Sequence, residues 1–164
     1  MPIHFHDVDI TPEVSELESA LIVPCIMCPA VTVAIREQNP LMRFFRSPFK
    51  SAPFEQYLEG LQARLLEHGV RNDVFKSRMY QHWFLCMWSS GRRRKLAERA
   101  KNFDAVIVLG CDSATETIKD AVESTGCKVI EAMEVGGLTN ARLKISFPDK
   151  VSFEGVKIVP MPHG

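Results

Sequence analysis

Cysteine is the residue type in this sequence that most directly suggests chemistry. Cys25 and Cys28 form a C-x-x-C pair directly after a short apolar run, and Cys111 follows a second run of the same kind. Each position also precedes a predicted helix, whose N-terminus carries partial positive charge and favours a thiolate over a thiol. Because the thiolate is the form that binds soft metals or attacks disulfides, we predict that these three cysteines belong to a working cluster.

The elements that must position these cysteines are predicted from the apolar runs. Residues 20–24 (ALIVP) and 105–109 (AVIVL) are continuous apolar stretches, typical of strands buried on both faces of a sheet. Helical spacing and cap residues alternate with such runs along the chain. Further strands are expected at 72–79 and 128–132, and helices at 30–38, 54–68, 92–103 and from a capping box at Ser113 and Glu116 to about 124.

This alternation predicts an α/β fold with a mostly parallel sheet flanked by helices, of the Rossmann or flavodoxin-like kind. A chain of 164 residues fits one domain, so we expect a single domain over 1–164. Within it, 1–18 is interpreted as a polar lead-in and 39–53 as a loop insertion with three prolines. Residues 141–159 are expected to form a C-terminal β-hairpin that adds antiparallel strands to the sheet edge.

The predicted sheet places most of the cysteines on one edge. In open parallel sheets, ligands bind outside the carboxyl ends of the strands, which is where Cys25, Cys28 and Cys111 are expected. Cys86 joins them if residues 72–79 form a strand whose exit leads to it. Cys127 precedes a strand and is interpreted as a packing residue, the usual role of an isolated cysteine.

Four thiolates at one site suit two kinds of metal centre. Cys25, Cys28, Cys86 and Cys111 could hold an iron–sulfur cluster, with a 4Fe–4S cluster preferred, or a closed zinc site. Soft sulfur ligands exclude magnesium and calcium. The spacing matches no standard ferredoxin or zinc-ribbon pattern. The leading hypothesis is a small metal-binding redox or electron-transfer protein that works within a larger enzyme system.

Two alternatives stay open. A strand followed by C-x-x-C and a helix is also the layout of thiol–disulfide oxidoreductases, in which Cys25 would attack and Cys28 would resolve. The second alternative is a non-catalytic interaction subunit that zinc stabilises. No acid–base pair stands out beyond the thiols, so the sequence does not establish catalysis.

Two basic segments suggest further contacts. Ser90, Gly91 and Arg92 combine a hydroxyl, a glycine and a helix start, which could form an anion site, although a solvated helix face explains such a run equally simply. The segment from Arg43 to Lys50 alternates arginines with phenylalanines, a composition typical of interfaces. It could dock a redox partner, cover the cysteines as a lid, or pack as a loop on the core.

Composition restricts the remaining classes. Lysine plus arginine and aspartate plus glutamate number 20 each, so the net charge is zero and bulk nucleic-acid binding is not expected. No apolar stretch is long enough for a membrane span, and the N-terminal residues lack the pattern of a signal peptide. We therefore expect a cytoplasmic protein, in which structural disulfides are rare.

The stretch VIVLGCDSATETIKDAVE, at 106–123, resembles a known family. Strand, Gly-Cys, small residues and helix are similar to the cysteine-rich α/β domain at the C-terminus of some methylenetetrahydrofolate reductases, and to related domains of corrinoid and heterodisulfide redox systems. The resemblance covers about residues 20–132 and implies iron–sulfur ligation and electron transfer. This chain lacks the dense C-x-x-C-x-x-C runs of that family, so the resemblance favours iron–sulfur over zinc and implies no methyl or folate chemistry.

Overall fold

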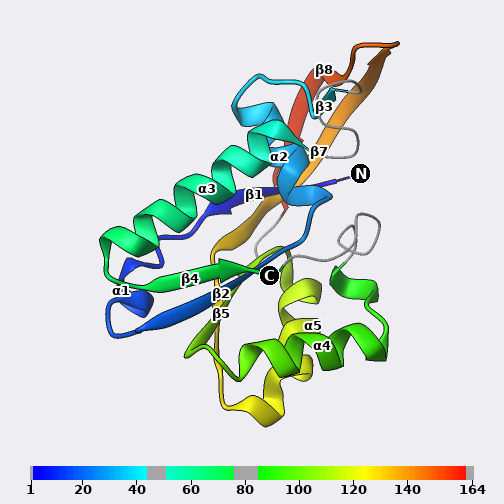
Figure 1. The fold of residues 1–164 in the computed structure, drawn as a ribbon. Coiled ribbons are helices and arrows are strands. Elements are labelled where there is room, and N and C mark those ends of the chain that lie inside the picture. Colours follow the sequence, from blue (N-terminus) through cyan, green and yellow to red (C-terminus); the bar gives the residue numbers. More distant parts are fainter. Residues whose placement is uncertain (1, 44–50, 76–84, 162–164) are drawn as a thin grey trace. The chain divides into compact units, whose positions relative to one another are not determined.

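The computed structural model describes residues 2–43, 51–75 and 85–161 (Figure 1). Its described part is a mixed α/β structure with one parallel and one antiparallel sheet, each of four strands. The chain divides into two compact units, which are described separately. Unit 1 comprises 1–6, 27–60 and 135–164, and unit 2 comprises 7–26 and 61–134. Because the chain passes between the units several times, the expected single domain over 1–164 stays a prediction.

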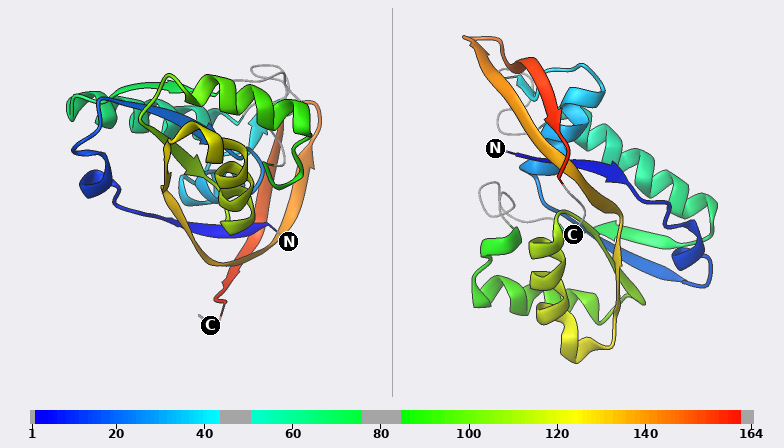
Figure 2. Two further views of the ribbon diagram at one scale, coloured as in Figure 1. Left: turned by 90° about the horizontal axis from the view of Figure 1, so that it is seen from below. Right: turned by 180° about the vertical axis from the view of Figure 1, so that it is seen from behind.

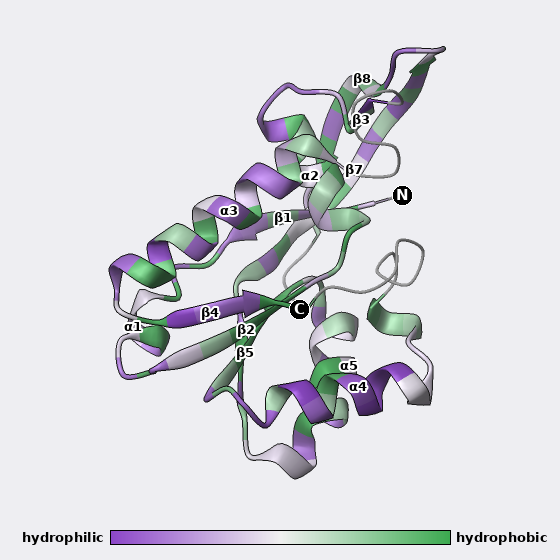
Figure 3. Cartoon of the chain, in the orientation of Figure 1, coloured by the Kyte–Doolittle hydropathy of each residue, from purple (hydrophilic) through white to green (hydrophobic). Residues whose placement is uncertain are grey.

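Unit 2 contains the parallel sheet that the apolar runs predict. Its strands are β2 (Ser19–Pro24), β4 (Arg71–Val74), β5 (Ala105–Leu109) and β6 (Lys128–Glu131), in the order β4-β2-β5-β6. All three neighbouring pairs are parallel. Every residue of β2 and β5 is buried. In Figure 3, neither strand contains a strongly hydrophilic residue. The prediction for 105–109 is confirmed, and β4 is shorter than the expected strand at 72–79, of which 76–79 lie outside the described residues.

Two helices cover one face of this sheet. Alternate residues of β2 and β5 form one apolar cluster with α4 (Ser90–Ala100) and α5 (Asp112–Val122), because strand side chains point to opposite faces in turn. Figure 2 shows α4 and α5 side by side in both of its views. The cluster consists mainly of Leu21, Val23, Val106, Val108, Leu96, Ala100, Ala114, Ile118 and Val122.

The start of α5 differs from the predicted capping box. The residue that caps the helix is Cys111, whose carbonyl accepts hydrogen bonds from Ala114 N–H at 2.7 Å and Thr115 N–H at 2.9 Å. Ser113 is therefore inside the first turn, and Glu116 accepts a hydrogen bond from Lys119 Nζ at 2.8 Å. The capping box was wrong because the helix begins as soon as the chain leaves β5. The helix ends through η2 (Glu123–Thr125) at Gly126, whose φ of 75° suits glycine.

Unit 1 contains the antiparallel sheet, which the sequence did not predict as a separate layer. Its strands follow the order β1-β7-β8-β3: β1 (Ile3–Asp7), β7 (Met133–Ser146), β8 (Lys150–Val159) and β3 (Met42–Arg43). The C-terminal hairpin is confirmed, but it does not extend the edge of the parallel sheet. Instead β7 pairs with β1, so the 1–18 segment is a strand followed by α1 (Thr11–Val14), and its interpretation as a polar lead-in was wrong. Of the expected 39–53 loop, Met42–Arg43 is a strand and Ala52 starts a helix.

The distal part of the hairpin has two chemically different faces. Cross-strand pairs place Leu143 opposite Phe153 and Ile145 opposite Val151, so these apolar side chains share one face. Arg142 pairs with Glu154 and Lys144 with Ser152 on the other face. Leu143 and Ile145 are 57% and 60% exposed, which is unusual for apolar residues on an ordered sheet face.

Two helices complete the described structure. The helix α2 (Cys28–Arg36) begins with Cys28-Pro29, where proline is tolerated because the first N–H groups have no partner within the helix. The helix α3 (Ala52–Glu67) is amphipathic, and its Leu61 and Leu65 are buried. None of the helices in the described residues is both long and apolar enough to cross a lipid bilayer.

The beginnings of β2 and β5 are tied together by one carboxylate, which yields a prediction about pH. Asp104 Oδ2 accepts hydrogen bonds from the N–H of Ser19 at 2.8 Å, its hydroxyl at 3.0 Å and the N–H of Glu18 at 3.1 Å. These bonds, led by the Ser19 hydroxyl, lower the pKa of Asp104. A carboxyl whose folded-state pKa is lowered stabilises the fold above its unfolded value of about 4, and this contribution is lost as the pH falls through the folded value.

We predict that Asp104→Asn lowers the urea midpoint at neutral pH, because an uncharged amide oxygen in the place of Oδ2 accepts these three hydrogen bonds more weakly than a carboxylate. The difference from the unaltered chain should shrink as the pH falls below about 4, since both then lack the carboxylate. Urea unfolding at pH 7 and at low pH measures this. Glu98→Gln, which changes an exposed carboxylate on α4, is the matched control. An equal loss of stability at both pH values would contradict the prediction.

Candidate functional site

The parallel sheet brings two of the predicted cysteines to neighbouring positions. Cys25 directly follows β2 and Cys111 follows β5 after Gly110, so both lie at the carboxyl edge of adjacent strands. The N–H of Cys25 donates to the carbonyl of Leu109 at 2.8 Å, which continues the β2–β5 pairing to the cysteine itself. The side chain of Cys25 is buried in the apolar cluster, and the half-buried Cys111 packs against that cluster.

Gly110 allows this edge to pack closely. A Cβ atom added at Gly110 would lie 2.8 Å from Cβ of Ala114, 3.4 Å from Cβ of Cys25 and 3.8 Å from Cδ1 of Leu85. The first distance is shorter than real Cβ contacts, so the absence of a side chain lets α5 begin against the end of β2. Leu85 opens η1 (Leu85–Met87), which therefore lies at the same edge. The packing role of Gly110 was not predicted, although a glycine between a buried strand and a helix is a recognisable signal in the sequence.

The other predicted cysteines have different environments. Cys86 follows buried Leu85 in η1, and its own side chain is exposed. Cys28 is half-buried at the start of α2 in unit 1. Because Cys28 follows Cys25 by three positions, the chain keeps their Cα atoms within about 11 Å. Cys127 has a packing role, with Sγ at 3.0 Å from the carbonyl oxygen of Ala100 and 2.9 Å from that of Phe103.

The thiols do not form a ready-made metal site. In the part of the chain that the structure describes, no three His, Cys, Asp or Glu side chains lie together in a way that could hold a metal ion. The four-sulfur site of Cys25, Cys28, Cys86 and Cys111 therefore stays a prediction. What the structure brings together is the pair Cys25 and Cys111 around Gly110, with Cys86 one residue from the same contact.

Aromatic rings and a buried arginine lie close to this edge. The guanidinium carbon of Arg92 lies 4.4 Å from the ring centroid of Trp88 and 5.2 Å from that of Phe75. The two rings are themselves 5.6 Å apart, and burial lowers the pKa of Arg92. Such cation–π contacts are strongest when desolvated, as here. Trp88 belongs to the same apolar cluster as Cys25, and its buried Nε1–H has no acceptor among the described residues.

The expected anion site at Ser90, Gly91 and Arg92 is placed at the start of α4, with Ser89 as the cap residue. Arg92 points its guanidinium at the rings described above, and Gly91 has open space around it. The anion site stays a prediction. Of the expected docking segment from Arg43 to Lys50, Arg43 is exposed in β3, and residues 44–50 lie outside the described part.

Comparison with known proteins identifies no relative. No protein family matches the chain, and neither a curated protein nor a solved structure matches it. The function is therefore inferred from the geometry of the carboxyl edge.

The close packing at Gly110 leads to a stability prediction. Gly110→Ala should destabilise the fold by about 1–3 kcal/mol, because the new methyl group overlaps Cβ of Ala114 and presses on Cys25. Gly91→Ala is the matched control, since nothing lies within 4 Å of its added Cβ and alanine favours a helix. Urea unfolding of both variants measures the difference.

A compensating change tests the cause of that loss. Combining Gly110→Ala with Ala114→Gly removes the closest of the three contacts, so it should restore part of the stability despite the helical cost of glycine, about 1 kcal/mol. If Gly110→Ala is as well tolerated as Gly91→Ala, the close approach of α5 to β2 is not a constraint.

Proposed function

We propose that this chain is a small redox protein that works through the cysteines at the carboxyl edge of β2 and β5. The observation that carries the proposal is the convergence of Cys25 and Cys111 on Gly110, at the ends of two adjacent parallel strands. The edge thus carries two free thiols, of which Cys25 is buried and Cys111 is half-buried.

The strand order supports this location. In chain order the parallel strands are arranged 2-1-3-4, which is the order of the first four strands of a flavodoxin-like sheet. In such sheets the order reverses between the first and third strands, and ligands bind in the crevice at this switch point. Here these strands are β2 and β5, which lead to Cys25 and Cys111. A flavodoxin-like fold is therefore part of the proposal.

The form of redox chemistry that the sequence favours is an iron–sulfur centre held by Cys25, Cys28, Cys86 and Cys111, with zinc as the alternative metal. As they stand, the described residues do not fit a metal without movement, because no three ligands lie together. Metal binding is commonly coupled to folding of the site. The exposed Cys86, and Cys28 at the start of α2, would have to move toward Cys25 when the metal binds. The buried Nε1–H of Trp88 is a donor in the same cluster, and hydrogen bonds to sulfur tune such centres.

Thiol–disulfide exchange is the second candidate, and the absence of three converging ligands in the described residues favours it. The Cys25 thiolate would attack a substrate disulfide, forming a mixed disulfide and releasing one substrate thiolate. The Cys28 thiolate would then attack the Cys25 sulfur, forming a Cys25–Cys28 disulfide and releasing the second substrate thiolate. The substrate disulfide is reduced and the protein dithiol is oxidised, and solvent protonates the released thiolates.

A protein partner, within a larger enzyme system, is part of the proposal. The apolar face of the β7–β8 hairpin supports it, because Leu143, Ile145 and the 84% exposed Phe147 leave apolar surface in water. Exposed apolar patches of this kind mark interaction surfaces. The resemblance to cysteine-rich domains of larger redox systems points to the same kind of partner.

The test of the proposal is metal content and thiol state after anaerobic purification. We predict stoichiometric iron and sulfide with a broad visible absorbance band, both lost in Cys25→Ala and Cys111→Ala. Cys127→Ala is the matched control and should keep the metal, because Cys127 is not a predicted ligand and its Sγ contacts the backbone carbonyls of Ala100 and Phe103. Circular dichroism of each variant establishes that it is folded.

Other outcomes separate the alternatives. Colourless protein with stoichiometric zinc would support the interaction subunit. Metal-free protein with a Cys25–Cys28 disulfide that a dithiol reduces would support exchange. If Cys25→Ala and Cys111→Ala left both metal content and redox activity unchanged, the carboxyl edge would not be the working site.

A further inference from the structure

A second group of chemically active side chains lies in unit 2 at the carboxyl end of β4. A hollow of about 330 Å³ is lined there by Asp73, Val74, Phe75, Lys95 and Arg99. Its volume falls within the range of small-molecule sites. None of the described lining residues is a cysteine, although Phe75 also contacts Trp88 of the apolar cluster. The sequence alone indicates a basic helix here and gives no link between its lysine and arginine residues and β4.

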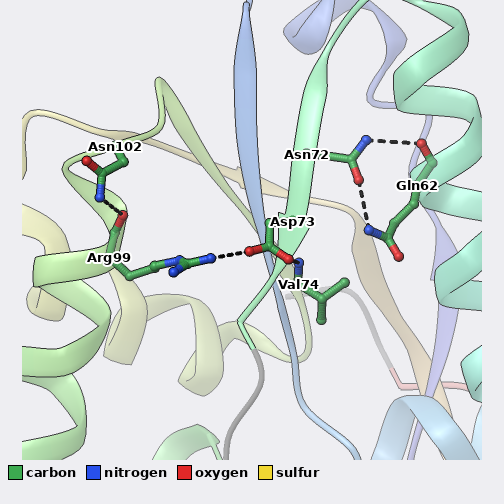
Figure 4. A network of polar contacts seen from close by, with 6 residues as sticks. All are labelled: Gln62, Asn72, Asp73, Val74, Arg99 and Asn102. Atoms are coloured by element: carbon green, nitrogen blue, oxygen red, sulfur yellow. Dashed lines mark hydrogen bonds and ion pairs between the residues drawn. The ribbon is translucent and has the colours of Figure 1, made fainter.

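Asp73 holds one of the two cations in place. Arg99 Nη2 donates to Asp73 Oδ2, and the N–H of Val74 donates to Asp73 Oδ1 at 2.8 Å (Figure 4). Both oxygens of the carboxylate are therefore engaged. Arginine has five N–H donors, and within the described residues the bond to Asp73 is the side-chain hydrogen bond that Arg99 makes. Asp73 thus orients a guanidinium that still presents donors.

Lys95 supplies the second cation of the described lining. It precedes Arg99 by four residues, so both side chains lie on the same face of α4. Lys95 is exposed on the wall of the hollow, and no carboxylate of the described residues lies within ion-pair distance of its ammonium group. Asp73 offsets one of the two positive charges, which leaves the described lining residues with a net charge of +1.

The walls and the location suggest an organic ligand. Val74 and Phe75 provide apolar surface beside the cations, so the hollow combines a charged end with an apolar side. It also lies at the carboxyl end of a parallel strand, where ligands of open α/β sheets bind. An oriented guanidinium fork matches the two oxygens of a carboxylate or a phosphate, and an ammonium group adds a point charge.

We propose that this hollow binds a small organic molecule that carries one oxyanion group, a carboxylate or a phosphate monoester. Lys95 and Arg99 contact the oxyanion, and Val74 and Phe75 contact the organic body. Because the charges of the described lining residues belong to α4 and β4, we expect binding to require neither a metal nor a particular thiol state.

Three probes with the same aromatic body separate charge from apolar contact: phenyl phosphate, benzoate and neutral benzyl alcohol. Each is titrated into the reduced, metal-free full chain at constant ionic strength, and backbone amide shifts are followed by NMR. We expect saturable shifts at Val74, Phe75, Lys95 and Arg99 with at least one oxyanion. Which of phenyl phosphate and benzoate binds more tightly identifies the oxyanion class, and benzyl alcohol should bind at least tenfold more weakly.

Matched variants test the role of Lys95. Lys95→Gln should raise the Kd of the bound oxyanion by about tenfold, the loss of one charged hydrogen bond. Lys95→Arg should bind within a few-fold of the unaltered chain. Arg94→Gln, an exposed cation on the same helix that does not line the hollow, should leave the Kd unchanged. Lys95→Arg keeps the test valid if Lys95→Gln fails to fold.

The proposal is overturned by any of three results. The first is no saturable shift with phenyl phosphate or benzoate, and the second is equal weakening by Lys95→Gln and Arg94→Gln, which would indicate diffuse surface charge. The third is benzyl alcohol binding as tightly as the oxyanions. None of these depends on Cys25 or Cys111, so failure here is distinct from failure of the redox proposal.

Discussion

The pairing of β2 with β5 is the constraint on which the rest of unit 2 depends. Five residue pairs run in parallel register from Ala20 and Ala105 to Pro24 and Leu109. Asp104 ties the strands at their beginnings, and the hydrogen bond from Cys25 to Leu109 ties them at their ends. Because a shift of one residue would turn every side chain to the opposite face, this register decides which residues reach the apolar cluster. It also decides that the two cysteine-bearing turns lie side by side.

The same pairing explains why the edge is closely packed. The helix α5 starts as soon as the chain leaves β5, with Cys111 as its cap, and Gly110 provides the space that this sharp turn needs. Leu85 fills the remaining side of the contact. Cys111 is held between the end of β5 and the start of α5, so the position of its thiol is well defined.

Charge is distributed unevenly in a chain whose net charge is zero. On α4, Arg92 is buried against two rings, Arg93 pairs with Asp120 and Arg99 pairs with Asp73. Each cation thus has a different environment, although all belong to one basic run. Treating that run as a uniform solvated face would hide both the cation–π contact and the hollow beside β4. The helix α4 therefore contacts the sheet, the rings of Trp88 and Phe75, and the hollow beside β4.

The sequence by itself determined the local elements. Continuous apolar runs identified β2 and β5, and Gly126 marked the end of the α5 segment. The position of a cysteine after each run located the edge, because burial and turn preferences are read over a few residues. Tertiary structure alone decided that β1 and the hairpin form a separate sheet, that Gly110 touches Cys25 and Leu85, that Cys86 is exposed, and that Asp73 meets Arg99. These contacts join segments far apart in the chain, where strand order and side-chain neighbours depend on the packing of the whole fold and leave no local pattern.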